Sequence, residues 1–339
     1  IRENADLRLW SATDVGRLLK VRRVTYTLSQ DSVGAYLARR GLVADGTSIE
    51  VDELGGGISG VVLAVRADGR RMVVKQALQR FRVADEWLVP PERAAAEAQA
   101  LELMARLAPG SVPTLLDSDA EAFVLVMEEA PADWRPWKAL LLDGTADPSV
   151  ATRLGELLAA LHSADADLGS AESFEAQRVD PYLRTIQRRH PELAERIGAY
   201  IDRLLETTSC VVHGDYSPKN VLVGDDGLWV IDWEVVHRGD PLFDLAFLLN
   251  HLLLKTIHRP HARDGYAVCG RAFLDAYGPV EDMPYLLGLT GCLMLARVDG
   301  KSPAEYLTEP GRERARAAGI ALLTAPAGSL REAWADLPP

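Results

Sequence analysis

The sequence predicts an α+β fold of two lobes, a smaller N-terminal lobe built on an antiparallel sheet and a larger, mostly helical C-terminal lobe. Three observations predict it. Short β-branched runs parted by glycine-rich or Asp-Gly turns fill residues 49–75. One more strand-like run follows at 122–127, and helix-type segments dominate after it. The 339 residues are enough for two units with their own cores.

The N-terminal lobe is predicted to span residues 1–130. It opens with a helical leader, 1–48, where cap-type residues at 27–31 precede apolar residues at helical spacing. A five-stranded sheet with one helix follows. The runs that read as strands are residues 49–54, 61–65, 72–75 and 122–127. The helix is residues 92–107, which are rich in Ala, Glu and Leu and follow two prolines.

The C-terminal lobe is predicted to span residues 131–339, with the boundary between Ala130 and Trp134. Composition and periodicity predict helices at residues 151–161, 182–189, 193–205 and 243–254, with more to the end of the chain. Clefts between two such lobes are common places for small-molecule sites. We therefore expect the functional residues around the junction.

The composition excludes several classes of function. A net charge of −12 argues against a nucleic-acid partner, because phosphate backbones are bound by Lys and Arg, and it favours a cationic or neutral small substrate. No apolar run reaches the ~18 residues of a membrane span. Three widely spaced cysteines, without a CxxC pair, favour a reduced, cytoplasmic compartment. The start lacks Met and a basic-then-apolar stretch, so we expect no signal peptide.

A glycine-rich segment, residues 55–62, satisfies the pattern GxGxxGxV. A dinucleotide-binding fold would need a helix after the glycines and an acidic residue about 20 positions on, whereas a strand follows here. Glycines let backbone amides approach phosphate oxygens, so we predict a flap over phosphates rather than a plain hairpin. The candidate nucleotide-binding residues are Gly55, Gly57, Ser59 and Gly60.

Lys75 ends an apolar strand, and its ammonium needs a polar partner because burial without one is costly. Glu97, on the following helix, is the candidate partner. A phosphate-binding lysine held by a helix glutamate is the arrangement found in kinases. The alternatives are an edge-strand charge for Lys75 and a solvated helix face for Glu97.

The strongest signal is an apolar strand, a polar loop and a second strand at residues 211–223. Asp215 and Asn220 are five apart, as are the catalytic Asp and metal-binding Asn of a kinase loop. A carboxylate there orients an acceptor hydroxyl and takes its proton, while the amide oxygen holds Mg²⁺. A hairpin turn brings Asp232 beside Asn220, and Glu234 follows as a second carboxylate ligand.

These motifs resemble the aminoglycoside phosphotransferase superfamily of small-molecule kinases, over residues 27–306. The matching segments are HGDxxxxN at 213–220, Ile-Asp at 231–232, DPLFDLA at 240–246 and LGELLAALH at 154–162. The resemblance implies a two-lobed protein-kinase-like fold, with Asp215 as the catalytic residue and His162 as a structural one.

Two segments are similar to the 5-methylthioribose kinase branch. They are VKQAL at residues 74–78 and the metal-binding pattern DxE at 232–234. Two others depart from it. That branch has Ser where Asn220 stands, and its pair of arginines is represented here by Ala296 and Arg297.

The resemblance also implies a hinge that binds the purine of ATP or GTP, at Met127, Glu128 and Ala130. Contacts are expected from the carbonyl of Glu128 and the amide of Ala130. For the acceptor, we predict contacts from Trp233, Arg297 and Trp134.

The function implied is Mg²⁺-dependent transfer of the γ-phosphoryl from ATP or GTP to a hydroxyl of a small molecule, by a monomer or homodimer. The expected acceptor is an antibiotic of aminoglycoside, nucleoside or macrolide type, in a resistance role, and the alternative is a methylthioribose-like metabolic sugar. A protein kinase is disfavoured, because Asp240-Pro241 follows Asp232 without an Ala-Pro-Glu segment. A nucleotide-binding pseudokinase, acting as an interaction module, is the remaining alternative.

Overall fold

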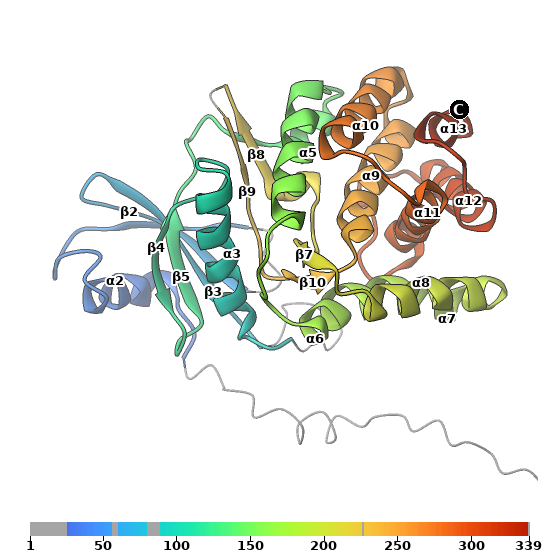
Figure 1. Ribbon diagram of the computed structural model, residues 1–339. Coiled ribbons are helices and arrows are strands. Elements are labelled where there is room, and N and C mark those ends of the chain that lie inside the picture. The colour runs from blue at the N-terminus through green and yellow to red at the C-terminus, as the bar shows by residue number, and fades with distance from the viewer. Residues whose placement is uncertain (1–25, 56–59, 80–88, 226, 338–339) are drawn as a thin grey trace, which may run out of the picture.

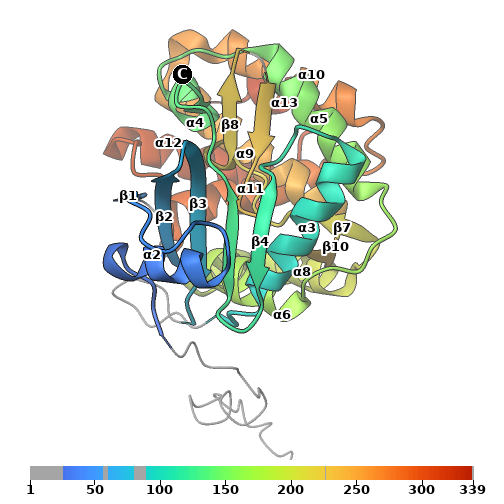
Figure 2. The ribbon, with the colours of Figure 1, turned by 90° about the vertical axis from the view of Figure 1, so that its left-hand side faces the viewer.

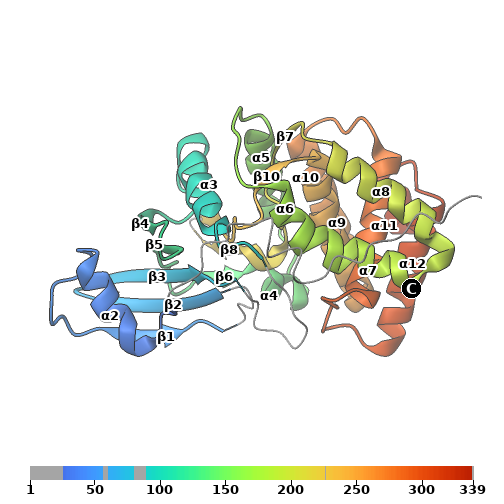
Figure 3. The same ribbon diagram turned by 90° about the horizontal axis from the view of Figure 1, so that it is seen from below.

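The computed structural model describes residues 26–55, 60–79, 89–225 and 227–337. A sheet lobe, with helices α2 (Gln30–Arg39) and α3 (Arg93–Leu107), lies on one side of the molecule, and a helical lobe lies on the other (Figure 1). Viewed from below, α3 lies on the side of the sheet opposite α2 (Figure 3). The predicted two-lobed α+β fold is confirmed.

The sheet of the N-terminal lobe is antiparallel with strand order β1-β2-β3-β5-β4 (Figure 2). The strands are β1 (Glu50–Glu53), β2 (Gly60–Ala67), β3 (Arg70–Ala77), β4 (Leu115–Asp119) and β5 (Val124–Glu128). The runs read from the sequence correspond to β1, β2, β3 and β5. Strand β4 has no such signal, because its Asp-Ser-Asp end consists of poor strand formers.

Local chemistry explains the central hairpin. Asp68 and Gly69 join β2 to β3 with positive φ angles of 51° and 73°, as the tight turns that match strand twist require. At the other end of β2, a Cβ on Gly60 would lie 2.3 Å from the Gln76 carbonyl oxygen, so only glycine fits. Helix α2 covers one face of this sheet with buried Val33 and Leu37.

The described part of the predicted leader holds one helix, α2, and residues 1–25 lie outside the described residues. The Gln76 side chain fixes the segment before α2 to the sheet. Its oxygen accepts from the Leu28 amide at 2.8 Å, and its nitrogen donates to the Tyr26 carbonyl at 3.0 Å. The interior glutamine therefore has partners for both its donor and its acceptor.

The C-terminal lobe packs its helices around two that are buried on nearly all sides, α9 and α11. Its helices are α4 (Trp137–Leu142), α5 (Pro148–His162), α6 (Ala171–Phe174), η1 (Glu175–Arg184), α7 (Thr185–Arg189), α8 (Ala194–Glu206), α9 (Pro241–His258), α10 (Arg263–Tyr277), α11 (Met283–Asp299), α12 (Glu309–Thr324) and α13 (Leu330–Ala335). Within the described ranges, no helix combines the length and the hydropathy that a membrane span needs.

One predicted helix begins in the wrong place. The sequence places its start at residue 182, but α6, the π-helix η1 and α7 run continuously from Ala171 to Arg189. Pro181 lies inside η1, and a proline argues against a helix interior because it lacks an N–H donor. The wider π-helical turn accommodates it, and this turn carries a side chain into the site described next.

Candidate active site

A hairpin in the C-terminal lobe places two of the predicted metal ligands side by side. Strands β8 (Val221–Gly224) and β9 (Gly227–Val230) pair in antiparallel register, and the Ile231 amide donates to the Asn220 carbonyl at 2.9 Å. Asn220 and Asp232 therefore lie at the open end of one hairpin. Asp232 has a φ of 67°, in the left-handed region where Asp is tolerated better than most residues.

The loop before this hairpin is fixed by a buried carboxylate from α9. Asp244 accepts hydrogen bonds from the amides of His213 and Gly214, at 2.7 and 2.9 Å. The His162 Nε2 atom lies 3.2 Å from the same carboxylate. Gly214 has a φ of 76°, and a Cβ there would lie 2.6 Å from the Val235 carbonyl oxygen. The contacts of His162 agree with a structural role.

The His213 side chain holds the loop from inside. Its Nδ1 atom accepts the Asp215 amide hydrogen at 3.1 Å, so the proton of the neutral ring is on Nε2, which faces the Ile231 carbonyl at 3.3 Å. Burial lowers the pKa of His213 below its ordinary value. A neutral histidine thus connects the loop to the segment carrying Asp232.

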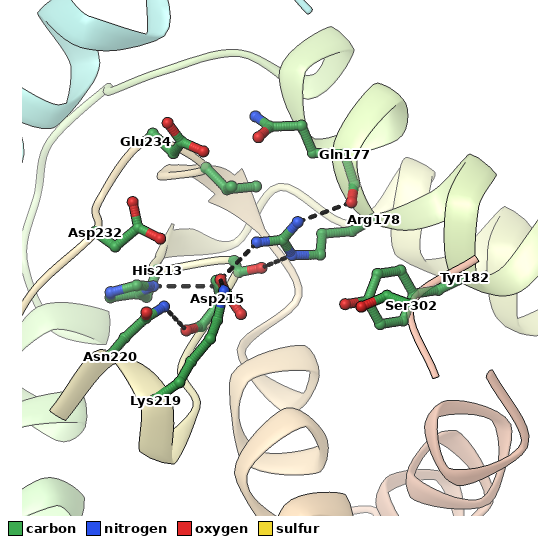
Figure 4. A network of polar contacts seen from close by, with 12 residues as sticks. Gln177, Arg178, Tyr182, His213, Asp215, Lys219, Asn220, Asp232, Glu234 and Ser302 are labelled. Carbon is green, nitrogen blue, oxygen red and sulfur yellow. Dashed lines mark hydrogen bonds and ion pairs between the residues drawn. The ribbon is translucent and has the colours of Figure 1, made fainter. Parts of the chain in front are cut away.

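Asp215, the predicted catalytic residue, is buried between two cations (Figure 4). Its carboxylate lies 2.8 Å from Arg178 Nη2 and 2.9 Å from Lys219 Nζ. Burial alone would raise the pKa of Asp215, but the positive charges of Arg178 and Lys219 outweigh burial and lower it. The carboxylate is therefore ionised at neutral pH and can accept a proton.

Sequence reasoning missed Arg178. It lies on η1, 37 positions before Asp215 along the chain, and it also donates from Nε to the Gly214 carbonyl at 2.9 Å. No motif marks it, because its place depends on the π-helical turn and on packing of distant segments. It fixes both the carboxylate of Asp215 and the backbone beside it.

Lys75 lies where β3 of the sheet lobe meets the hairpin of the helical lobe. Its ammonium is 3.0 and 2.8 Å from the two Glu97 carboxylate oxygens and 2.5 Å from Asp232. Burial would lower the pKa of Lys75, but Asp232, Glu97 and Glu234 together raise it well above its usual value. The predicted pairing of Lys75 with Glu97 is thus present in the geometry, and the lysine stays charged.

Three carboxylates converge at this point. Glu97, Asp232 and Glu234 each offer an oxygen within 4.8 Å of the others. Burial first, and then the neighbouring Asp232 and Glu234, raise the pKa of Glu97. Arg93, which the sequence did not mark, contacts the Glu234 carboxylate at 3.2 Å. Hard oxygen donors of this kind suit Mg²⁺.

Asn220 completes the candidate metal site from the hairpin. Its Nδ2 atom donates to the Asp215 carbonyl at 2.9 Å, which leaves Oδ1 as the atom available to a cation. Asn220, Asp232 and Glu234 remain the predicted ligands, and the structure adds Glu97 as a neighbouring carboxylate.

The nucleotide-binding residues are placed in part. Gly55 and Gly60 lie on either side of the predicted flap in the sequence, whereas Gly57 and Ser59 lie outside the described residues. At the hinge, the Glu128 amide donates to the Thr114 carbonyl of the outer segment at 2.9 Å. Strand β5 ends at Glu128, so the purine contacts of the Glu128 carbonyl and the Ala130 amide stay a prediction.

The two tryptophans predicted to touch the acceptor pack around the β8–β9 hairpin. Trp233 is 1% exposed, donates to the Val230 carbonyl at 3.0 Å and packs 4.4 Å from the His213 ring. Trp134 packs edge-on against Trp229 at 5.3 Å, near the turn of the hairpin and away from its open end. Trp233 is thus a core residue, and Trp134 covers the hairpin turn.

Arg297 lies near Tyr182, which in turn lies near Arg178, the partner of Asp215. Its Nη1 atom donates to Ser302 Oγ at 2.7 Å and approaches the Tyr182 hydroxyl at 3.5 Å. The Tyr182 ring in turn lies 5.9 Å from the Arg178 guanidinium. Figure 4 shows Tyr182 and Ser302 on the side of Asp215 opposite Asp232 and Glu234.

The fold and the site together define a class, the phosphotransferases of the kinase type that act on the hydroxyl of a small molecule. After Asp232 the chain passes directly through β10 (His237–Gly239) into α9. This connection leaves no room for the long activation segment that a protein kinase carries there. The alternative of a protein kinase is therefore not supported.

The chain belongs to the phosphotransferase enzyme family, whose family model matches residues 50–285. It is similar to the methylthioribose kinase of Pectobacterium atrosepticum, with 27% identity over 264 residues, which are 67% of this chain and 66% of that protein. It is also similar to the methylthioribose kinase of Cronobacter sakazakii, with 28% identity over 70% of this chain and 67% of that one. The chain thus spans about two thirds of these relatives.

Solved structures share the fold at low identity. A choline/ethanolamine kinase family protein from Mesorhizobium loti has a TM-score of 0.56 and 18% identity, over 90% of this chain and 97% of that one. The amicoumacin kinase hAmiN has a TM-score of 0.54 and 12% identity, over 87% and 96%. The predicted kinase-like fold and the predicted family are both confirmed.

Proposed function

We propose that the chain transfers the γ-phosphoryl group of ATP or GTP to a hydroxyl of a small molecule. The observation that carries this proposal is the convergence of Lys75 and three carboxylates on one side of Asp215. These residues come from β3, α3 and the segment after β9. A site that only bound nucleotide would have no use for a buried, ionised Asp215.

Each residue has a role in this proposal. Lys75, held by Glu97, binds the α- and β-phosphates, and Asp215 orients the acceptor hydroxyl and takes its proton. Asn220, Asp232 and Glu234 would hold Mg²⁺, which supplies charge neutralisation on the phosphates. The transfer is direct and in line, so positioning and electrostatics provide most of the rate.

A sugar-like metabolite is the first acceptor to test. The methylthioribose kinase relatives support it, because they cover about 70% of the chain at 28% identity. The VKQAL segment, which holds Lys75, and the DxE pattern point to the same branch. An antibiotic hydroxyl, expected from the wider superfamily, is the second candidate.

Nucleotide consumption tests the proposal. ATP and GTP are each supplied with Mg²⁺ and a panel of methylthioribose, aminoglycosides, nucleosides and macrolides, and Asp215→Asn serves as the blank. We expect turnover on at least one hydroxyl compound, absent from the blank, with the product identified by mass. Tight nucleotide binding without any transfer would instead favour the pseudokinase alternative.

A further inference from the structure

One face of α9 leads away from the catalytic loop. Phe247, His251 and Lys255 are spaced by four residues, so they share that face. Phe247 lies near the partner of Asp215: its ring is 5.8 Å from the Arg178 guanidinium and 5.9 Å from the Tyr182 ring. Lys255 follows about 12 Å further along the helix axis, and its side chain leans back toward the helix N-terminus.

Lys255 is the unusual residue on this face. Its side chain is fully buried, and its ammonium has no hydrogen-bond partner among the described residues. It lies 5.4 Å from the centre of the Tyr306 ring, and the Tyr306 hydroxyl also lacks a partner there. A buried ammonium without an acceptor costs several kcal/mol, so a protein that keeps one needs a reason for it.

The charges around Lys255 make the position less favourable still. Burial first, and then the positive charges of Lys138 and Arg297, lower the pKa of Lys255 to about 7, while Glu305 opposes them. Glu305 is itself paired with Lys138 at 2.5 Å. No described carboxylate therefore contacts Lys255.

Arg297 has an unused donor in the same region. Its Nη1 atom is bonded to Ser302, but its Nε atom is buried without a partner among the described residues. The same positive charges act on His251: burial first, and then Lys255 and Arg297, lower the pKa of His251 well below its ordinary value. The region around Lys255, Arg297 and His251, which we call the region beyond Tyr182, is thus electropositive, although the chain as a whole carries a net charge of −12.

We infer that this region binds an anionic group of the acceptor, a carboxylate or a phosphate, through Lys255 and Arg297, while the acceptor hydroxyl lies at Asp215. The inference rests on the proposed function and specifies its substrate class. An oxyanion would supply the acceptors that Lys255, Arg297 and Tyr306 lack. It would also favour sugar acids or sugar phosphates over neutral methylthioribose and over cationic aminoglycosides.

Equilibrium binding tests this inference without phosphoryl transfer. Glucose, gluconate and glucose 6-phosphate share a hydroxyl-rich skeleton and differ in charge, and each is titrated calorimetrically into the full chain with Mg²⁺ and a non-hydrolysable nucleotide. We expect at least one anionic member to bind about tenfold more tightly than glucose. Comparison of gluconate with glucose 6-phosphate distinguishes a carboxylate from a phosphate.

Two variants link that preference to the residues. Lys255→Met keeps the length of the side chain, and Arg297→Gln keeps a polar group. Both are expected to remove most of the preference for anions. Lys301→Met is the matched control, because Lys301 is exposed and paired with Asp180 at 3.4 Å, and it should leave binding unchanged.

The outcomes separate this inference from the proposed function. Lys255→Met should fold, because replacing a buried unpaired charge by an apolar side chain is neutral or stabilising. Equal binding of all three compounds, no binding of either anion, or a preference that survives both variants would overturn the inference. Phosphorylation of a neutral acceptor alone would overturn it too, yet leave the kinase proposal intact.

Discussion

The two sides of Asp215 differ in the sign of their charge. On the nucleotide side three carboxylates meet two cations, and the residues are Glu97, Asp232, Glu234, Lys75 and Arg93. On the side that we propose for the acceptor, called the acceptor side below, the cations predominate, and they are Arg178, Lys219, Arg297 and Lys255. The catalytic loop separates an excess of negative charge, which suits a metal–nucleotide complex, from an excess of positive charge. In Figure 4, Asp232 and Glu234 lie on one side of Asp215, and Tyr182 and Ser302 lie on the other.

This difference shows that overall charge says little about a binding site. The net charge of −12 favours a cationic or neutral substrate, whereas the side chains beyond Tyr182 favour an anionic one. The acidic residues that set the net charge are mostly on the surface, where they act on solubility. The local set of buried charges is the relevant quantity for recognition.

The largest effect is expected at the boundary between the two sides. Asp215→Asn keeps the shape of the side chain but cannot accept a proton, so turnover should fall by about 10²–10⁴-fold. Nucleotide affinity and the circular dichroism spectrum should stay near those of the unmodified chain. Turnover within a factor of a few of the unmodified value would remove Asp215 from the mechanism.

Lys75→Met removes a positive charge from the nucleotide side. It should abolish most turnover and destabilise the fold by about 3 kcal/mol, because Glu97, Asp232 and Glu234 lose their shared cation. Lys75 lowers the pKa values of Glu97 and Asp232, so both rise in its absence, and the destabilisation should shrink as pH falls from about 7.5 to about 5.5. Urea denaturation at both pH values measures this. A deficit independent of pH would argue against charge repulsion as its cause.

Arg178→Gln alters the acceptor side without touching the metal ligands. Arg178 lowers the pKa of Asp215, so its removal should keep Asp215 protonated to higher pH. Turnover should fall by about tenfold at neutral pH, and the acidic limb of the kcat/KM profile should move upward in pH. Arg188→Gln is the control, since Arg188 is exposed and contacts Asp180 at 3.5 Å. An unchanged profile would limit Arg178 to a packing role.

The smallest expected effect is the difference between Asp232 and Glu234, the two carboxylates of the DxE pattern, in Mg²⁺ binding. Glu234 is held by Arg93, whereas Asp232 lies at the open end of the hairpin. Glu234→Gln should lower the apparent affinity for Mg²⁺, measured from turnover, by less than about tenfold. Asp232→Asn should lower this affinity more. Titration of Mg²⁺ at saturating nucleotide compares them. Equal losses would show that both carboxylates ligate the metal alike.

Much of the fold and the nucleotide side was predictable because the signals are local. The β2–β3 hairpin follows from Asp68-Gly69, and the adjacency of Asn220 and Asp232 follows from one short turn. Strand β4 was not located, since polar residues at its end hide it, and η1 was misjudged because of Pro181. In both places tertiary packing outweighs local preference.

The acceptor side was poorly predictable for a different reason. Arg178, Arg297 and Lys255 come from η1, α11 and α9, and only helix packing brings them near one another. In the sequence Trp233 lies beside the predicted metal ligands and Trp134 just past the predicted hinge, but both pack on the hairpin. Sequence distance is a good guide within a hairpin and a poor one between helices.

The buried carboxylate of Asp244 has a consequence for how the molecule opens. It accepts the amide hydrogens of His213 and Gly214, and it belongs to α9, at the centre of the helical core. Those two hydrogens can exchange with deuterated solvent only when α9 separates from the loop. The loop that carries the chemistry should therefore be as slow to exchange as the core helices, and its protection should report the global free energy of unfolding.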